Sequence, residues 1–379
     1  MAEICQHLGI QGIAGEILAG ILIGPSLLGW VHPIPILETF SELAVMLLLF
    51  RVGLDVSPSD LLKVSGQALV VAAAGVVLPF FLSWAVLTAY GASSIEAIFV
   101  GAAMVATSVG ITAHVLAARG VLDHRASQII LAAAVIDDLL GLLVLAAVAS
   151  LASGTIDYWR IALTCLLASA FVLLVALYGT KLMSGAAPRL KKNLKLQESE
   201  FSIAMVLLFA LSLLAVYAGV AAIIGAFLAG LVLSGTAGPR LRDLSSGAME
   251  LMLPFFLVGI GLHVDLAVFK QPAIVRLAIV LLIAAILSKL IGCGLGAFPL
   301  GRKDMLRIGV GMIPRGEVGM VVAKLGLGIG MVSLPIYGVV VAVCVATTVL
   351  APPLLAIVFK DVPPSPNASE HFQSISNIH

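Results

Sequence analysis

The chain has 379 residues, of which 61% are hydrophobic and only 11% are charged. Soluble domains carry roughly 25% charged residues, so this composition excludes a soluble enzyme. The formal net charge of +1 also gives no strongly basic surface for nucleic acid. The sequence therefore predicts a polytopic membrane protein.

Apolar segments long enough to cross a bilayer, about 20 residues each, recur along the whole chain. Because only helices and closed barrels satisfy the backbone inside lipid, we expect an all-α fold of about twelve transmembrane helices. After the last segment, residues 359–379 are polar and predict a disordered cytoplasmic tail. The segments lie near residues 11–30, 36–53, 67–90, 95–118, 127–150, 160–183, 200–218, 220–236, 248–264, 274–298, 304–330 and 332–358.

The loop charges predict the orientation. Most of the 21 Lys and Arg residues lie in loops that follow even-numbered segments, whereas Arg160, Lys270 and Arg276 lie in loops on the opposite side. Cytoplasmic loops carry the excess of positive charge in membrane proteins. Both termini are therefore expected in the cytoplasm.

Two sequence motifs recur in the second half of the chain. GEILAG at residues 15–20 resembles GAFLAG at 225–230, and VGLDV at 52–56 resembles IGLHV at 260–264. The offsets relate the first segment to the eighth and the second to the ninth, and a shift of seven helices reverses direction. Such inverted-topology repeats are typical of secondary transporters. The alternative is chance similarity, since glycine-rich packing motifs are common in membrane helices.

The fourth and eleventh segments carry helix-breaking residues at corresponding places. Thr107 and Ser108 precede a glycine in the fourth segment, and the run Pro314 to Glu317 interrupts the eleventh. Proline removes a backbone donor, and breaks at membrane depth persist where the freed groups line a cavity or an ion site. We therefore expect two broken helices. Alternatively, the hydroxyls of Thr107 and Ser108 bond back to preceding carbonyls in an unbroken helix.

Adjacent carboxylates, Asp137 and Asp138, lie about midway along the fifth segment. Each such charge costs roughly 2.5 to 3.5 kcal/mol at the bilayer centre, so a function is expected. Neighbouring helical residues point about 100° apart, which gives the two side chains different surroundings. Lys289, at a similar depth in the tenth segment, is the expected counter-ion for one of them. Protons and a bound cation would then compete for the same negative charge.

The oxygen atoms available near this place suit a hard cation such as sodium. Arg315 and Glu317, two residues apart and so on different faces of a regular helix, are expected to brace the broken segment rather than to bind the ion. Four cysteines without paired spacing indicate neither a disulfide framework nor a zinc site. We expect no cofactor.

Taken together, GEILAGILIGPSLLG, the Asp137-Asp138 pair, Lys289 and MIPRGEVGMVVA resemble the monovalent cation:proton antiporters. The closest likeness is to bacterial sodium/proton exchangers of the second cation:proton antiporter family, over about residues 10–358. The resemblance implies that Asp138 carries the ion and the proton, with Thr107 and Ser108 at the sodium site. It also implies that Asp137 and Lys289 form a switchable ion pair.

The same resemblance implies a transport domain, residues 1–358, in which a core moves as an elevator against a dimer domain. The core would hold residues 67–150 and 274–358, and the dimer domain residues 11–53 and 200–264. The implied protein is a homodimer in the lipid of the bacterial inner membrane, exchanging sodium or lithium for protons electrogenically. The nucleotide-binding tail of potassium-efflux relatives is not expected here, which favours an unregulated exchanger.

Other functions remain open at this point. Potassium/proton exchange fits the same residues, because the sequence does not measure the radius of the site. A sodium-coupled solute symporter shares the general architecture, although Lys289 beside two aspartates suits competition between ion and proton better. An intramembrane aspartyl protease needs its two aspartates on separate helices, and the adjacency of Asp137 and Asp138 argues against it.

Overall fold

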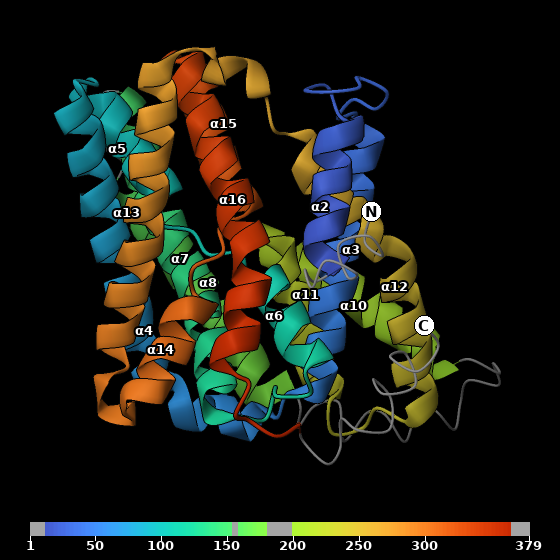
Figure 1. The fold of residues 1–379 in the computed structure, drawn as a ribbon. Helices are drawn as coiled ribbons and strands as arrows, with labels where there is room; N and C mark the ends of the chain where they lie inside the picture. The colour runs from blue at the N-terminus through green and yellow to red at the C-terminus, as the bar shows by residue number, and fades with distance from the viewer. Residues whose placement is uncertain (1–11, 154–157, 180–198, 365–379) are drawn as a thin grey trace. The chain divides into compact units, whose positions relative to one another are not determined.

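The computed structural model describes residues 12–153, 158–179 and 199–364 (Figure 1). Over these residues the chain forms fourteen α-helices and no strand, which confirms the predicted all-α fold. The chain divides into two compact units. Unit 1 comprises Met1–Pro35, Val64–Ile156 and Leu257–His379, and unit 2 comprises Ile36–Lys63 and Asp157–Phe256.

Unit 1 contains both broken helices and all of the predicted site residues. Its elements are α2 (Gly12–Ile23), most of α4 (Pro58–Tyr90), α5 (Ser94–Ala103), α6 (Val109–Ala118), α7 (Arg125–Ser153), the end of α12 (Pro239–Leu262), a 3-10 turn η2 (Leu266–Lys270), α13 (Pro272–Gly296), a second 3-10 turn η3 (Phe298–Leu300), α14 (Arg302–Gly311), α15 (Glu317–Gly328) and α16 (Leu334–Val358).

Unit 2 is built from the remaining helices. They are α3 (Pro35–Asp55), the first residues of α4, α8 (Tyr158–Leu174), a π-helical turn η1 (Val175–Gly179), α10 (Ser199–Tyr217), α11 (Ala222–Leu233) and most of α12 (Pro239–Leu262). An ion-pair network joins two of these helices, α3 and α12. Asp55 pairs with both Arg51 and Arg242, and Arg51 Nε donates to Ser246 Oγ over 2.8 Å.

Local sequence explains several helix starts. Pro272 lies in the first turn of α13, and α16 likewise has a proline there, where a missing backbone N–H costs nothing. Ser93 caps α5 by accepting a hydrogen bond from the backbone N–H of Glu96. The Glu96 carboxylate in turn accepts from the N–H of Ser333 over 2.8 Å. This contact joins the start of α5 to the start of α16.

Each predicted apolar segment contains a helix, but the first is shorter than expected. The sequence predicted a helix over residues 11–30, whereas α2 ends at Ile23 and a turn follows. Pro25 has no backbone N–H to continue the helix, and Gly29 has φ of 63°, a left-handed conformation that glycine adopts readily. The predicted residues 180–183 and most of the tail, 365–379, lie outside the described residues.

Five helices in the described residues are long and apolar enough to cross a membrane. They are Lys63–Tyr90, Glu200–Tyr217, Pro239–Lys270, Pro272–Gly296 and Leu334–Val358. Shorter apolar helices include both halves of the interrupted fourth segment, at Ser94–Ala103 and Val109–Ala118. Interruption therefore explains why part of the apolar sequence does not form full-length spans.

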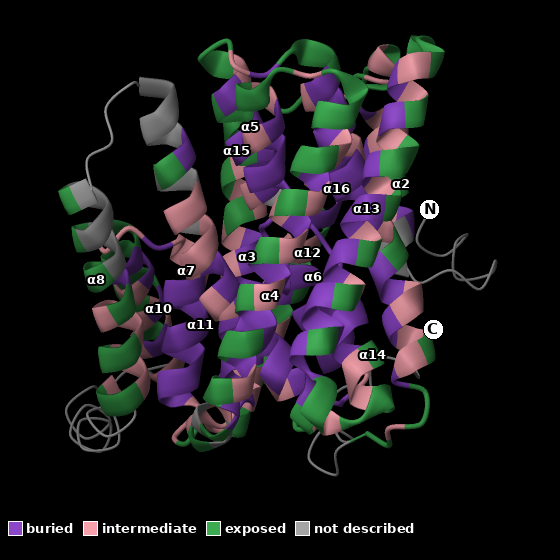
Figure 2. Ribbon diagram, turned by 90° about the vertical axis from the view of Figure 1, so that its left-hand side faces the viewer, coloured by how far each residue is buried: buried purple, intermediate pink, exposed green. Residues whose placement is uncertain are grey.

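The halves of the two broken helices lie at opposite ends of unit 1. In Figures 1 and 2, α5 and α15 lie in the upper half and α6 and α14 in the lower half. α15 packs on α5, and α7 contacts α5, α6 and α14. The connecting residues, 104–108 and 312–316, thus lie at mid-height beside the helix that carries Asp137 and Asp138.

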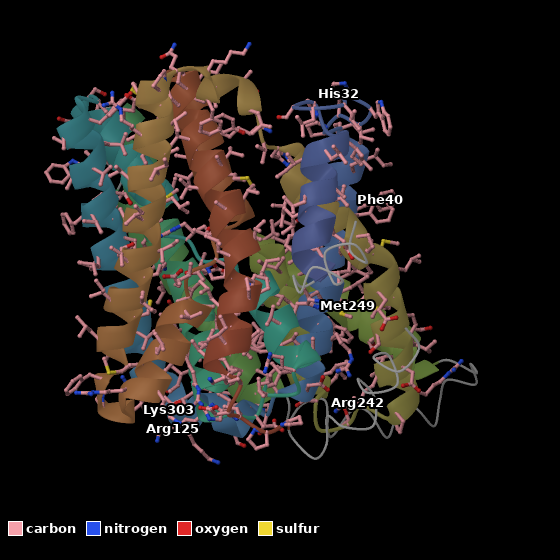
Figure 3. The ribbon with its side chains drawn as sticks, viewed as in Figure 1. His32, Phe40, Arg125, Arg242, Met249 and Lys303 are labelled. Carbon is pink, nitrogen blue, oxygen red and sulfur yellow. The ribbon has the colours of Figure 1, made fainter. Side chains whose placement is uncertain are left out.

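The distribution of buried and charged residues agrees with this arrangement of the helices. Figure 2 shows α6 in unit 1 and α11 in unit 2 buried over most of their length. Within unit 1, Figure 3 places Arg125, at the start of α7, and Lys303, in the first turn of α14, at one end, with His32 at the other. The middle of unit 1 is therefore the place where a charged side chain has to be held by other groups of the protein.

Candidate functional site

The two aspartates of α7 are both buried. The exposed fraction is 0% for Asp137 and 6% for Asp138. Because adjacent residues of a helix point about 100° apart, the two carboxylates meet different neighbours. Asp137 faces α13, and Asp138 has interactions of its own.

Lys289 of α13 forms an ion pair with Asp137. Its Nζ lies 3.1 Å from Oδ1 and 3.3 Å from Oδ2, so the ammonium contacts both carboxylate oxygens. Both side chains are fully buried. Removing either charge would leave the other unpaired inside the protein, which is much more costly than burying the pair. Of the two aspartates, the structure thus brings Asp137 to the predicted counter-ion.

The first interruption places two hydroxyls beside this pair. Between α5 and α6 the chain leaves the helical conformation, and Thr107 and Ser108 are both buried. The Thr107 hydroxyl is near the Asp137 carboxylate, and neither the Thr107 nor the Ser108 hydroxyl has a hydrogen-bond partner in the described part of the chain. The alternative of an unbroken helix is wrong at this position, because Ser108 is in an extended conformation with φ −81° and ψ 97°.

The second interruption meets the first through the backbone. The N–H of Ser108 donates a hydrogen bond of 2.8 Å to the carbonyl oxygen of Pro314. Gly316 also packs closely against Ser108, since a Cβ atom at position 316 would lie 2.7 Å from Ser108 Oγ and 2.8 Å from Ser108 Cβ. A backbone donor freed by one break is thus satisfied by an acceptor freed by the other.

Arg315 is anchored between α13 and α16. Its side chain is fully buried, and Nη2 donates to the carbonyl oxygen of Ala285 over 2.9 Å. Its backbone N–H donates to Thr347 Oγ1 over 3.2 Å, and its carbonyl accepts from Thr348 Oγ1 over 2.7 Å. These contacts suit the predicted bracing role. Glu317 begins α15, and its side chain lies outside what the structure describes.

Several contributing residues gave no separate signal in the sequence. Thr347 and Thr348 are hydroxyl residues within the apolar α16, and both are fully buried. Two hydroxyl residues in an apolar helix indicate that a backbone group lies nearby to bond with them. Which backbone group this is depends on the tertiary packing. Gly75 of α4 and Cys293 of α13, which border the ion pair, were likewise not singled out.

The assembled site combines an ion pair with a second carboxylate, at which a proton and a metal cation can replace each other. Lys289 offsets the charge of Asp137, while the neighbouring carboxylate of Asp138 can take either a proton or a metal cation. Hydroxyl oxygens and peptide carbonyls at the two interruptions are ligands of the kind that hard cations prefer. In the described residues no group of three or more His, Cys, Asp or Glu side chains is arranged to hold a resident metal ion.

Comparison with known proteins gives consistent matches over nearly the whole chain. The family model described as "Sodium/hydrogen exchanger, transmembrane" matches residues 1–361. The chain is 34% identical to the high-affinity Na(+)/H(+) antiporter NhaS3 of Synechocystis sp., covering 94% of this chain and 86% of that protein. It is 32% identical to the Na(+)/H(+)-K(+) antiporter GerN of Bacillus cereus, covering 94% and 92%.

A solved structure shows the same fold. The sodium proton antiporter MjNhaP1 from Methanocaldococcus jannaschii superposes with a TM-score of 0.69 and 17% sequence identity, covering 95% of this chain and 92% of that one. At this identity the match concerns the fold alone.

Proposed function

Because the chain belongs to the sodium/hydrogen exchanger family, we propose that it is a secondary antiporter that exchanges sodium for protons across a membrane. It is a transporter rather than an enzyme, and sodium and protons are its substrates. Both relatives described above, at 34% and 32% identity, bear sodium/proton antiporter names. The observation that carries the proposal is the buried Lys289–Asp137 pair, 3.1 Å apart, next to Asp138.

In the proposed cycle Asp138 carries either a sodium ion or a proton. Ionised Asp138, with the hydroxyls of Thr107 and Ser108, binds the dehydrated ion, and protonation of the carboxylate releases it. Asp137 and Lys289 act as a switchable pair. When a cation arrives, its positive charge favours loss of a proton from Lys289, so two protons exchange for one sodium or lithium ion and transport is electrogenic.

An inverted repeat is part of the proposal, and two helix contacts support it. A Cβ atom on Gly20 of α2 would collide with the backbone of α12 at Gly261, and one on Gly53 of α3 would collide with the backbone of α11 at Gly230. The sequence repeat relates Gly20 to Gly230 and Gly53 to Gly261. It therefore converts one contact into the other, as expected if the two halves of the chain share a fold.

The membrane arrangement completes the proposal. About twelve helices or helix pairs cross the bilayer, with both termini in the cytoplasm of a bacterial cell and the protein assembled as a homodimer. The basic residues Arg125 and Lys303 at one end of unit 1 (Figure 3) support the orientation. Movement of a core against a dimer domain, as an elevator, provides alternating access.

Proton movement in proteoliposomes tests this function. Vesicles containing the protein and a pH-sensitive dye receive sodium, lithium or potassium in turn, with and without an imposed membrane potential. Sodium-driven proton movement that responds to the potential is expected. If none of the three cations elicits proton movement, the antiport function is contradicted. A sodium current that depends on an added organic solute would indicate symport instead.

Potassium/proton exchange is the second candidate. The name of the Bacillus cereus relative GerN includes potassium as well as sodium, and the residues of the site are compatible with either ion. In the same vesicles, half-saturation at a lower concentration of potassium than of sodium would favour this candidate.

A further inference from the structure

Lys289 lies on one face of α13 together with three small residues. Gly292, Cys293 and Gly296 follow it at spacings of three, four and seven residues, and residues at these spacings share a helix face. All four are buried, and the side chains of Lys289 and Cys293 are completely so. The ion-pairing lysine thus belongs to a packed face of its helix.

The helix packed against this face is α4. A Cβ atom on Gly292 would lie 2.7 Å from the carbonyl oxygen of Ala74, and one on Gly296 would lie 2.9 Å from Val71 Cα. The Gln67 side chain also donates a hydrogen bond to the Gly296 carbonyl. Because the contacts at Gly292 and Gly296 are made with the backbone of α4 itself, α13 has little freedom to shift along α4.

Gly75 is the residue of α4 that lies beside the Lys289–Asp137 ion pair. A Cβ atom at this buried position would lie 2.6 Å from Cys293 Sγ, 3.5 Å from Lys289 Nζ and 3.9 Å from Asp137 Oδ1. The Cys293 sulfur therefore occupies the space that a side chain at position 75 would need. The ion pair is bounded on this side by a glycine and a thiol, neither of which carries a charge that could replace its own.

We propose that Gly75 and Cys293 are positioning residues that hold the Lys289 ammonium against Asp137 and thereby set the affinity of the site for the transported cation. The inference rests on the proposed antiport function and adds α4 to the elements that define the ion site. The thiol fills the space beside the ammonium, and the glycine leaves room for the thiol. A change in size on either helix displaces the ammonium.

The two residues are expected to compensate for each other. In Gly75→Ala the new methyl group collides with Sγ, so either the thiol turns toward the ion pair or α13 moves away from α4. In Cys293→Ala a gap opens beside the ammonium. The double variant moves one heavy atom from α13 to α4 and nearly restores the packing. Contacting residues are the ones for which such non-additive effects arise.

The test measures the half-saturating sodium concentration for proton movement in proteoliposomes, over a series of pH values, for the parent and these three variants. Each single variant should raise it roughly tenfold or more, since binding sites tolerate only about 0.5 Å of displacement. The double variant should return to within about threefold of the parent. Gly66→Ala on the same helix is the matched control, because a Cβ atom there meets nothing within 4 Å.

The outcomes separate this inference from the proposed function. A parent protein without sodium-driven proton movement overturns both. An active parent with an unchanged half-saturating concentration and pH profile in both single variants overturns the positioning role alone, as does a double variant no better than the worse single one. If Gly75→Ala does not fold, Cys293→Ala and the double variant still decide: an unaltered profile in Cys293→Ala contradicts the inference.

Discussion

The backbone N–H of Ser108 donates a hydrogen bond of 2.8 Å to the carbonyl oxygen of Pro314, which ties the two interrupted helices to each other beside Asp137. A buried backbone donor without a partner costs about 1 to 3 kcal/mol. Each break therefore depends on the other for its hydrogen bonding. A disturbance in α14 or α15 is expected to reach Thr107 and Ser108 directly.

This relationship predicts that Gly316→Ala destabilises the protein by about 1 to 3 kcal/mol, the usual cost of overpacking. The added methyl group would lie within 2.8 Å of Ser108 Cβ. Gly316 has a negative φ of −132°, so the effect would come from the contact rather than from backbone strain. The melting temperature in detergent provides the measurement. Ser108→Gly should restore stability in the Gly316→Ala background, and Gly328→Ala, with nothing within 4 Å, should not reduce it.

Asp138→Asn is expected to abolish exchange and to leave a folded protein. An amide can still donate and accept hydrogen bonds, but it neither carries a compensating charge nor releases a proton near neutral pH. Sodium-driven proton movement in proteoliposomes should fall to the level of empty vesicles. Asp361→Asn is the matched control, because that carboxylate is 52% exposed and pairs with a surface lysine. Near-normal exchange in Asp138→Asn would remove Asp138 from the carrier role.

Lys289→Gln is expected to weaken exchange and to remove its dependence on membrane potential. Without the lysine, Asp138 alone carries one proton per sodium ion, so no net charge moves. If the variant responds to an imposed potential as strongly as the parent, Lys289 is a structural brace and both protons come from the aspartates.

The same pair makes a prediction about stability. Lys289→Gln leaves Asp137 buried without its partner, at a cost of roughly 3 to 5 kcal/mol. The double variant Asp137→Asn with Lys289→Gln removes both charges and should melt at a higher temperature than Lys289→Gln alone. A double variant less stable than either single one would show that the two charges do not depend on each other.

His124, in the loop before α7, predicts a pH dependence of stability. Burial lowers the pKa of His124, with Asp304 raising it and Arg307 lowering it by smaller amounts. The ring Nδ1 accepts a hydrogen bond from the Ala126 N–H over 3.2 Å, and the ring packs against Phe359 with centroids 5.9 Å apart. Both contacts suit the neutral imidazole.

Since the folded pKa lies below the ordinary value of 6.5, the stabilising contribution of neutral His124 is fully present above about pH 6.5 and is lost as the pH falls through the folded pKa. His124→Asn keeps a capping acceptor but does not titrate. Its melting temperature should fall less than that of the parent between neutral and mildly acidic pH. Equal falls in both proteins would exclude His124 as a cause.

Much of the fold follows from local sequence. Long apolar segments indicate helices because a buried backbone must bond within itself, and Pro314 marks an interruption because proline has no donor. The sequence also predicts a functional site at Asp137, Asp138 and Lys289, because charged residues within apolar helices are costly, and the structure pairs Asp137 with Lys289. The early end of α2 at Ile23 was missed, although Pro25 and Gly29 explain it.

Only the tertiary structure decided which groups meet. The adjacency of Asp137 and Asp138 required different surroundings for each, and the packing of α7 against α13 brought Asp137 to the lysine. Likewise, Ser108 and Pro314 lie in segments far apart along the chain, so no local pattern reveals their hydrogen bond. The sequence by itself determined the residue types, their depth and their periodicity, because these depend on transfer from water and on helix geometry. Partner choice depends on contacts between distant segments, which the three-dimensional packing of α4, α7, α13 and α16 creates.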